Sequence, residues 1–234
     1  MIVYGKNVIK EVVKNKRQIY EIYVNKKMKD KFFLKFLSQN KIKYQLTDKH
    51  NLNEKVQNKE HQGVVAKVQD YEYSNLYSFL KLDKLKKFLI LDSIHDPHNL
   101  GAILRTMETT DFDGVIISKK NQVFLTGAVA KSASGALEYV NVFLVDDLYQ
   151  TIIELKKNNI LIIGTDSKAN LSFDEIEYNN RSFAIVLGNE GLGIRFLLKK
   201  NCDFLIKIPM KGKINSLNVS VVAALVMYIS QIKY

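Results

Sequence analysis

The segment FLILDSIHDPHNLGAILRTMETTDFDGVIIS, residues 88–118, decides the predicted fold. Its ends, residues 88–92 and 114–118, are short and almost continuously apolar, and residues 101–112 between them are long enough for a helix. A strand that is apolar along its whole length is typical of a parallel sheet whose two faces are both covered. The segment therefore predicts a strand, a helix and a parallel strand, which is the repeating unit of an α/β fold.

Further apolar runs of the same kind follow at residues 142–145, 160–165, 183–188 and 204–208. Residues 147–158 predict a helix between two of these strands, and residues 216–232 predict a closing helix. The closing helix carries a broad apolar face at helical spacing, formed by Leu217, Val221, Ala224, Leu225 and Tyr228. These patterns predict a parallel sheet covered by helices over residues 88–234.

The first 75 residues predict a separate, smaller α/β unit. Apolar side chains at helical spacing indicate helices around residues 8–13 and 32–37. Three stretches predict strands, at residues 19–24, 42–46 and 63–68. Residues 76–87 are polar, charged and aromatic, and we interpret them as a linker between the domains 1–75 and 88–234.

Composition and charge restrict the class of protein. Of the 234 residues, 47% are hydrophobic and 25% are charged, which excludes an intrinsically disordered chain. Residues 1–75 hold 16 basic and 8 acidic side chains, net +8, whereas residues 76–234 carry only +3 of the total of +11. A basic unit of this kind suits a polyanion such as RNA. A genome-wide bias is the alternative explanation, because 31 of the 35 basic residues are lysine.

The remaining composition favours a cytoplasmic protein that contacts no membrane. Cys202 is the single cysteine, so no internal disulfide can form and a reducing compartment is expected. The longest apolar stretch, near residues 219–229, is too short to span a bilayer. The four histidines show no metal-ligand spacing, and no metal is expected.

Ligands of such sheets bind beyond the carboxyl ends of the strands, and the first polar segment there is residues 93–106. Pro97 biases Asp96 away from helix, and we expect Asn99 to be the N-cap of a helix beginning near Leu100. Arg105 follows almost two turns later and is one of only four arginines. A capped helix with a solvated arginine is the simpler interpretation, and a need for the planar guanidinium is the alternative.

The second polar segment is LGNEGLGI, residues 187–194. Gly188, Gly191 and Gly193 allow backbone to approach a ligand closely. Their GxxGxG spacing is neither the dinucleotide GxGxxG nor a phosphate loop. Glu190 between them would repel a phosphate, so a pure phosphate cradle is disfavoured.

The third polar segment is IPMKGKINSLNVS, residues 208–220, where Asn215, Ser216 and Asn218 cluster at the start of the closing helix. Helix capping explains any one of them alone. Three polar, irregular segments at one sheet edge together predict a ligand site. Nucleophilic catalysis is disfavoured, because the single cysteine lies outside these segments.

Taken together, the three segments resemble the signature motifs of the SpoU/TrmH family of RNA ribose 2′-O-methyltransferases, within the SPOUT superfamily. Residues 91–117 are similar to motif 1, residues 185–194 to motif 2 and residues 208–228 to motif 3, and KSASGALEYV (131–140) between them also fits. The N-terminal YGKNVIKEVV and EHQGVVAKV resemble the ribosomal-protein-like RNA-binding domain of the RlmB-type subgroup, which modifies guanosines of large-subunit ribosomal RNA.

The resemblance implies a deep trefoil knot, bound S-adenosylmethionine and an obligate homodimer whose active site takes groups from both protomers. It places Asn99, Arg105, Glu190, Ser216 and Asn218 at the family's active-site positions. It places cofactor contacts at Gly188, Ile208 and Leu217, with Thr165 as a further candidate. Two departures, Met107-Glu108 and Asp111-Phe112, replace commoner residues of motif 1.

Methyl transfer to a ribose requires alignment of the donor with the hydroxyl and loss of the hydroxyl proton. The family often assigns the base to the position of Arg105, but an arginine is effectively always protonated. Our hypothesis is that Arg105 grips the target phosphate and stabilises the developing alkoxide.

Three alternatives to a ribosomal RNA methyltransferase remain. The main alternative is a non-catalytic, knotted dimer that binds ribosomal RNA as an assembly factor, against which the intact Asn99, Arg105, Glu190 and Ser216 argue. A transfer RNA 2′-O-methyltransferase of the same family is the second, and the basic residues 1–75 favour ribosomal RNA over it. A nucleotide-dependent oxidoreductase is the third, disfavoured by the absent GxGxxG.

Overall fold

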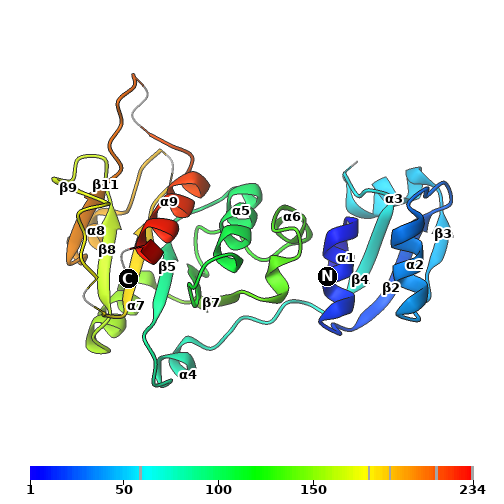
Figure 1. Ribbon diagram of the computed structural model, residues 1–234, viewed down its shortest axis with the longest axis horizontal. Coiled ribbons are helices and arrows are strands. Elements are labelled where there is room, and N and C mark those ends of the chain that lie inside the picture. The colour runs from blue at the N-terminus through cyan, green and yellow to red at the C-terminus, as the bar shows by residue number, and fades with distance from the viewer. Residues whose placement is uncertain (58–59, 179, 190, 214–215, 233–234) are drawn as a thin grey trace. The chain divides into compact units, whose positions relative to one another are not determined.

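The computed structural model describes residues 1–234 except 58–59, 179, 190, 214–215 and 233–234. The chain divides into two compact units, and Figure 1 labels most of their elements. The first unit comprises Met1–Glu72 and Phe124–Glu138, and the second comprises Tyr73–Val123 and Tyr139–Tyr234. The chain therefore leaves the second unit after Val123, contributes a short segment to the first, and returns.

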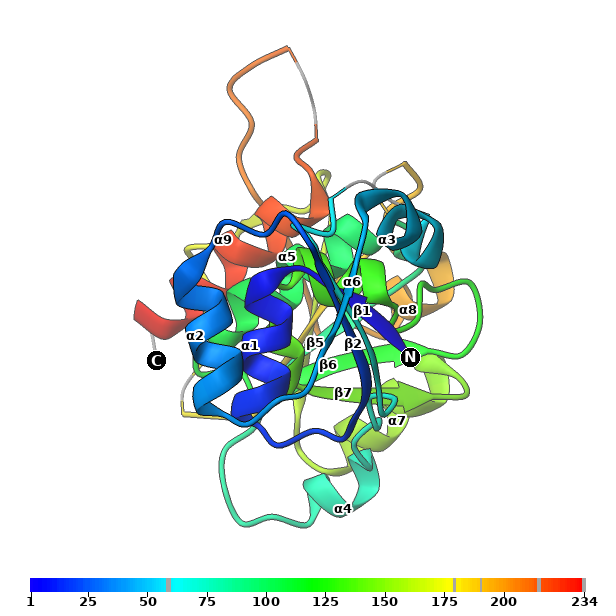
Figure 2. The same cartoon turned by 90° about the vertical axis from the view of Figure 1, so that its right-hand side faces the viewer.

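The first unit contains a four-stranded sheet in the order β1-β4-β2-β3. Strand β4 runs antiparallel to β1 and β2, while β2 and β3 are parallel. Figure 2 shows α1 and α2 on one side of these strands and α3 on the other. The bounds are β1 Ile2–Tyr4, α1 Lys6–Lys14, β2 Ile19–Asn25, α2 Lys31–Gln39, β3 Gln45–Thr47, α3 Lys49–Val56 and β4 Val64–Val68.

Sequence patterning locates most of this unit but misses two elements. Strand β1 has three residues, and helix α3 buries only Leu52, so neither produces an apolar period. Helix α3 instead begins at a cap, where Asp48 Oδ1 accepts a hydrogen bond from the Asn51 amide at 2.9 Å. The strand predicted at residues 42–46 begins only at Gln45.

The segment between β6 and β7 completes the first unit with α6 (Gly127–Ser132) and a 3₁₀ turn (Ala136–Glu138). A Cβ at Gly127 would lie 2.2 Å from the Ile2 carbonyl oxygen, so only glycine allows this approach to β1. Arg17 Nε donates to both carboxylate oxygens of Glu138, at 3.2 and 3.1 Å. Residues 124–138 are therefore held to the N-terminal residues by backbone contact and by an ion pair.

The second unit contains a seven-stranded sheet in the order β7-β6-β5-β10-β8-β11-β9, and every neighbouring pair is parallel. The six strands predicted from apolar runs are confirmed, and β9 adds a short edge. The strand bounds are β5 Lys87–Leu91, β6 Gly114–Ser118, β7 Asn141–Val145, β8 Leu161–Thr165, β9 Leu171–Ser172, β10 Phe183–Leu187 and β11 Phe204–Lys207. The helix bounds are α4 Leu76–Leu80, α5 Pro97–Glu108, α7 Leu148–Lys157, α8 Phe196–Lys200 and α9 Val219–Ile232.

Helices cover both faces of this sheet, as its continuous apolar strands require. One core joins Phe88, Ile90 and Phe143 of the strands to α7 and α8. Side chains alternate along a strand, so the strand residues next to these three point to the opposite face of the sheet. There α5 and α9 pack against each other, with a 3.0 Å hydrogen bond between the hydroxyls of Thr109 and Tyr228.

The stretch expected as a linker is partly folded. Helix α4 begins after Asn75, whose Oδ1 accepts the Ser78 amide at 2.8 Å. The Phe79 ring packs edge-to-face on Phe88 and Phe143, with centroids 5.8 and 5.2 Å apart. Leu80 therefore belongs to the core of the second unit, and Leu76 and Phe79 pack against that core.

None of the helices in the described part of the chain combines the length and the apolar character needed to cross a membrane.

Candidate functional site

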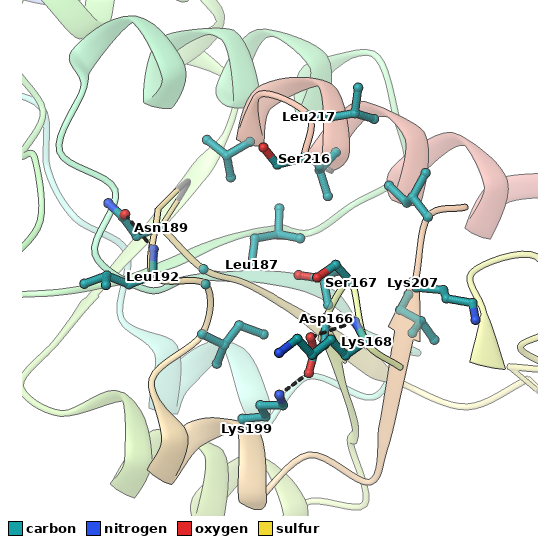
Figure 3. Close-up of a pocket in the computed structure, with 18 of the residues that line it drawn as sticks. Asp166, Ser167, Lys168, Leu187, Asn189, Leu192, Lys199, Lys207, Ser216 and Leu217 are labelled. Atoms are coloured by element: carbon teal, nitrogen blue, oxygen red, sulfur yellow. Dashed lines mark hydrogen bonds and ion pairs between the residues drawn. The ribbon is translucent and has the colours of Figure 1, made fainter. Parts of the chain in front are cut away.

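Four neighbouring strands, β5, β10, β8 and β11, end together at one edge of the second unit's sheet. The strand order reverses along this edge, which is where α/β sheets commonly bind ligands. A pocket of about 510 Å³ lies there, and the residues at the start of α9 form part of its wall (Figure 3). Its size is within the range of small-molecule sites.

The pocket has an apolar part and a polar part. The apolar part is formed by Leu187, Ile194, Ile206, Ile208, Leu217 and Val222. The polar part is formed by Thr165, Asp166, Ser167, Lys168 and Lys199. This combination suits a ligand with an apolar ring and polar substituents.

Asp166 follows β8 directly and is the carboxylate that lines the pocket among the described residues. It forms an ion pair with Lys199, and its Oδ1 accepts the Lys168 amide at 3.0 Å (Figure 3). Burial alone would raise the pKa of Asp166, but the hydrogen bonds from Lys199 and Lys168 outweigh burial and lower the pKa. Asp166 is therefore ionised at neutral pH.

Gly188 directly follows β10, at a point where only glycine fits. A Cβ there would lie 2.1 Å from the Gly193 carbonyl carbon and 2.2 Å from the Ile194 nitrogen. These are backbone atoms, which cannot move aside as a flexible side chain could. The absent side chain therefore lets the two ends of the loop that follows β10 close against each other.

Asn189 holds this loop in shape. Its Oδ1 accepts the amides of Gly191 and Leu192 at 2.9 and 3.4 Å, and its backbone pairs in both directions with Gly193. Its Nδ2 donates to the Ser93 carbonyl at 3.0 Å. The loop of motif 2 is thus fastened to the segment of motif 1.

A buried carboxylate makes a second connection between the same segments. Asp92 follows β5 and is 0% exposed. Its Oδ2 accepts the Arg195 amide at 2.9 Å, and its Oδ1 accepts Arg195 Nε at 2.7 Å. A charge this deeply buried requires such partners, so Asp92 and Arg195 fix the end of the loop before α8.

The pocket brings together five of the predicted site residues. Thr165, Gly188, Ile208, Ser216 and Leu217 all line it, although they come from three separate segments of the chain. Ser216 and Leu217 lie on the α9 side in Figure 3. Thr165 is fixed across the sheet, because its hydroxyl donates to the Val186 carbonyl at 3.1 Å.

Asn99 and Asn218 meet beside the pocket. Asn218 Nδ2 donates to Asn99 Oδ1 at 2.9 Å, while Asn218 Oδ1 accepts the Ser220 amide at 2.8 Å. The prediction that Asn99 is an N-cap is wrong. The cap is Asp96, whose Oδ1 accepts the His98 amide at 2.8 Å, with Pro97 as the first helical residue.

The other two predicted residues are not placed in the pocket. Arg105 is exposed near the end of α5 and does not line it. Glu190 lies outside the described residues.

Sequence reasoning missed Asp92, Asp166 and their basic partners. Asp92 is 103 residues from Arg195, and Asp166 is 33 residues from Lys199, so no local pattern connects either pair. The available signal was position, because each aspartate directly follows an apolar strand whose carboxyl end lies at the predicted edge. Among the described residues, no group of three or more His, Cys, Asp or Glu could hold a metal ion.

The fold and the pocket define an α/β protein with a partly apolar pocket, of a size that suits a small ligand, at the carboxyl edge of a parallel sheet. A model of the SpoU rRNA Methylase family matches residues 86–228. A second model, RNA 2′-O ribose methyltransferase substrate binding, matches residues 2–74.

Individual proteins agree with these matches. YacO of Bacillus subtilis, assigned to the TrmH family of tRNA/rRNA methyltransferases, is 40% identical over 233 residues, which are 97% of this chain and 93% of YacO. The chain therefore belongs to the SpoU rRNA methylase family, a family of RNA methyltransferases also called SpoU/TrmH.

Solved structures show the same fold at low identity. An RNA 2′-O ribose methyltransferase has a TM-score of 0.81 at 20% identity, covering 100% of this chain and 88% of that one. AviRb of Streptomyces viridochromogenes, in complex with the cofactor AdoMet, has a TM-score of 0.80 at 18% identity, covering 99% of this chain and 89% of that one.

Proposed function

We propose that this chain transfers a methyl group from S-adenosylmethionine to a ribose 2′-hydroxyl of structured RNA. A guanosine of large-subunit ribosomal RNA is the favoured target, and transfer RNA is the second candidate. Family membership supports the reaction class. The net charge of +8 on residues 1–75, and their match to a substrate-binding family model, support an RNA-binding role for that domain.

The observation that carries the proposal is the composition of the pocket. Residues of the second and third motif-like segments, among them Gly188, Ser216 and Leu217, line one cavity at the edge of the sheet, together with Thr165 at the end of β8. A pocket assembled from these separate segments is what an enzyme needs to hold a donor next to an acceptor.

The pocket residues fit S-adenosylmethionine. The apolar part, which includes Ile206, Ile208 and Leu217, suits a flat adenine ring. The ionised Asp166 suits hydroxyl or ammonium groups, and Gly188 allows close backbone packing around the ligand. Bound there, the cofactor supplies an electrophilic methyl group on a sulfonium.

The chain's own residues position the acceptor. The Asn99–Asn218 hydrogen bond holds the start of α5 against the start of α9 beside the pocket. In this proposal Arg105 remains protonated, binds the target phosphate and stabilises negative charge on the 2′-oxygen as the hydroxyl loses its proton.

The proposal includes the homodimer and the deep trefoil knot that the resemblance implies. Arg105 does not line the pocket of its own chain. A homodimer would allow Arg105 of one protomer to act at the pocket of the other. Sedimentation of the purified protein tests the dimer, and a monomeric species with full activity would exclude this arrangement.

Methyl transfer from tritiated S-adenosylmethionine to unmodified ribosomal RNA and transfer RNA transcripts tests the reaction. We expect label in ribosomal RNA, at a linkage that resists alkali, because a 2′-O-methyl group removes the hydroxyl that attacks the neighbouring phosphate. Label in transfer RNA alone would show that transfer RNA, and not ribosomal RNA, is the substrate. Label that remains on a base, or no label with either RNA, would refute the reaction.

A further inference from the structure

Arg195 lies at the rim of the pocket, and one nitrogen of its guanidinium, Nε, already donates a hydrogen bond within the protein. It lies in the chain between Ile194 and Lys199, which both line the pocket. Its Nε donates to the buried Asp92 at 2.7 Å, yet its side chain is 54% exposed. Within the described part of the chain, Asp92 is its only ion-pair partner. Asp92 therefore orients a guanidinium on a side chain that remains more than half exposed.

Large apolar side chains next to Arg195 are also exposed. Phe196, the first residue of α8, is 79% exposed, and Leu192 in the preceding loop is 92% exposed. We call Leu192, Arg195 and Phe196 the rim surface. The Phe196 ring is not packed in the core and is not needed to stabilise the fold, whereas Arg195 holds Asp92 through Nε and still leaves more than half of its side chain exposed.

The two groups match the two parts of a nucleotide. An arginine fork binds a phosphate through parallel hydrogen bonds. An aromatic ring stacks on an unpaired base whatever its sequence. We propose that the rim surface binds the RNA strand next to the target nucleotide, with Arg195 on a phosphate and Phe196 under a base.

This inference rests on the proposed function and adds a substrate contact within the second unit. Residues 76–234, which include the rim surface, carry a net charge of +3, and the Arg195 guanidinium adds a local cation that attracts a polyanion. The position also favours RNA, because the strand that presents a ribose to the pocket must pass its rim. A protein partner, such as a second copy of this chain, is the competing occupant and is an outcome of the test.

The test uses two substitutions that preserve the loop. Arg195→Lys keeps a cation for Asp92 but removes the fork, and Phe196→Ala removes the ring without leaving a buried charge. Lys200→Ala is the matched control, because Lys200 is an exposed cation at the end of the same helix.

Binding is measured by anisotropy of a short fluorescein-labelled single-stranded RNA of mixed sequence, with S-adenosylmethionine affinity measured by calorimetry. We expect Phe196→Ala to weaken RNA binding about tenfold, as lost stacking does. We expect Arg195→Lys to weaken it about fivefold with little change in the salt dependence, because lysine keeps the positive charge and loses only the fork. Both variants should bind S-adenosylmethionine within about twofold of wild type. The control Lys200→Ala should bind the RNA within about twofold of wild type.

Three results would overturn the inference: unchanged RNA affinity in both variants, an equal loss in Lys200→Ala, or a loss that accompanies dissociation of a dimer. A loss of cofactor affinity with normal RNA binding would also overturn it, because the rim surface would then only support the pocket. Failure of the proposed function is distinguishable, since wild type would then bind the labelled RNA, and the variants less well, without any methyl transfer.

Discussion

Gly188→Ala should abolish much of the cofactor affinity while leaving the protein folded. The added Cβ would lie 2.1 Å from the Gly193 carbonyl carbon and 2.3 Å from its oxygen, whereas ordinary contacts begin near 3.4 Å. The loop must therefore move by more than about an ångström, and overpacking of this kind costs about 1–3 kcal/mol. If the cost falls on the closed loop that forms the pocket wall, S-adenosylmethionine should bind about 5- to 150-fold more weakly.

Isothermal titration calorimetry measures this affinity, and thermal denaturation without ligand measures stability. Lys200→Ala is the control, because Lys200 is exposed at the end of α8 and does not line the pocket. We expect it to bind the cofactor like wild type. Equal affinity of Gly188→Ala and wild type, or equal losses in the two variants, would refute the role given to the loop.

Three further predictions follow from named groups. Arg105→Lys should lower turnover far more than cofactor affinity, because the guanidinium is proposed to act on the RNA. A normal rate of methyl transfer in single-turnover kinetics would contradict this role. Asp166→Asn should weaken S-adenosylmethionine binding about tenfold, as expected when a charged hydrogen-bond partner is lost, and unchanged affinity in calorimetry would remove Asp166 from the site. Burial, together with Lys49 and Lys131, lowers the pKa of His61, whose usual value is 6.5. The unfolded chain then binds more protons, so stability should be complete above about pH 6.5 and fall as the solution is acidified. Urea midpoints at about pH 7.5 and about pH 5.5 should differ more in wild type than in His61→Gln, and equal differences would reject this linkage.

The sheet of the second unit could be predicted because its central strands β5, β6 and β10 are buried along their whole length. That burial leaves a continuous apolar run, as in residues 183–187, which is 0% exposed throughout. Short or polar elements leave no such signal: β9 has two residues, and α3 buries one side chain.

The candidate site could be predicted in part for a similar reason. Gly188 and Ser216 stand where a strand ends or a helix begins, and such positions can be recognised from local pattern. The start of α5 was misjudged, although Asp96 followed by Pro97 is itself a signal for capping. The pairing of Asp92 with Arg195 depends on two strands meeting side by side, which only the folded chain specifies.

The most direct test of the account is a ribose methylation map of ribosomal and transfer RNA from cells with and without the gene. The account predicts that one 2′-O-methyl group disappears from large-subunit ribosomal RNA without the gene. Expression of the wild-type chain should restore it, and expression of Gly188→Ala should restore less. Identical maps of both RNA classes in the two strains would contradict the proposal that this chain methylates a ribose.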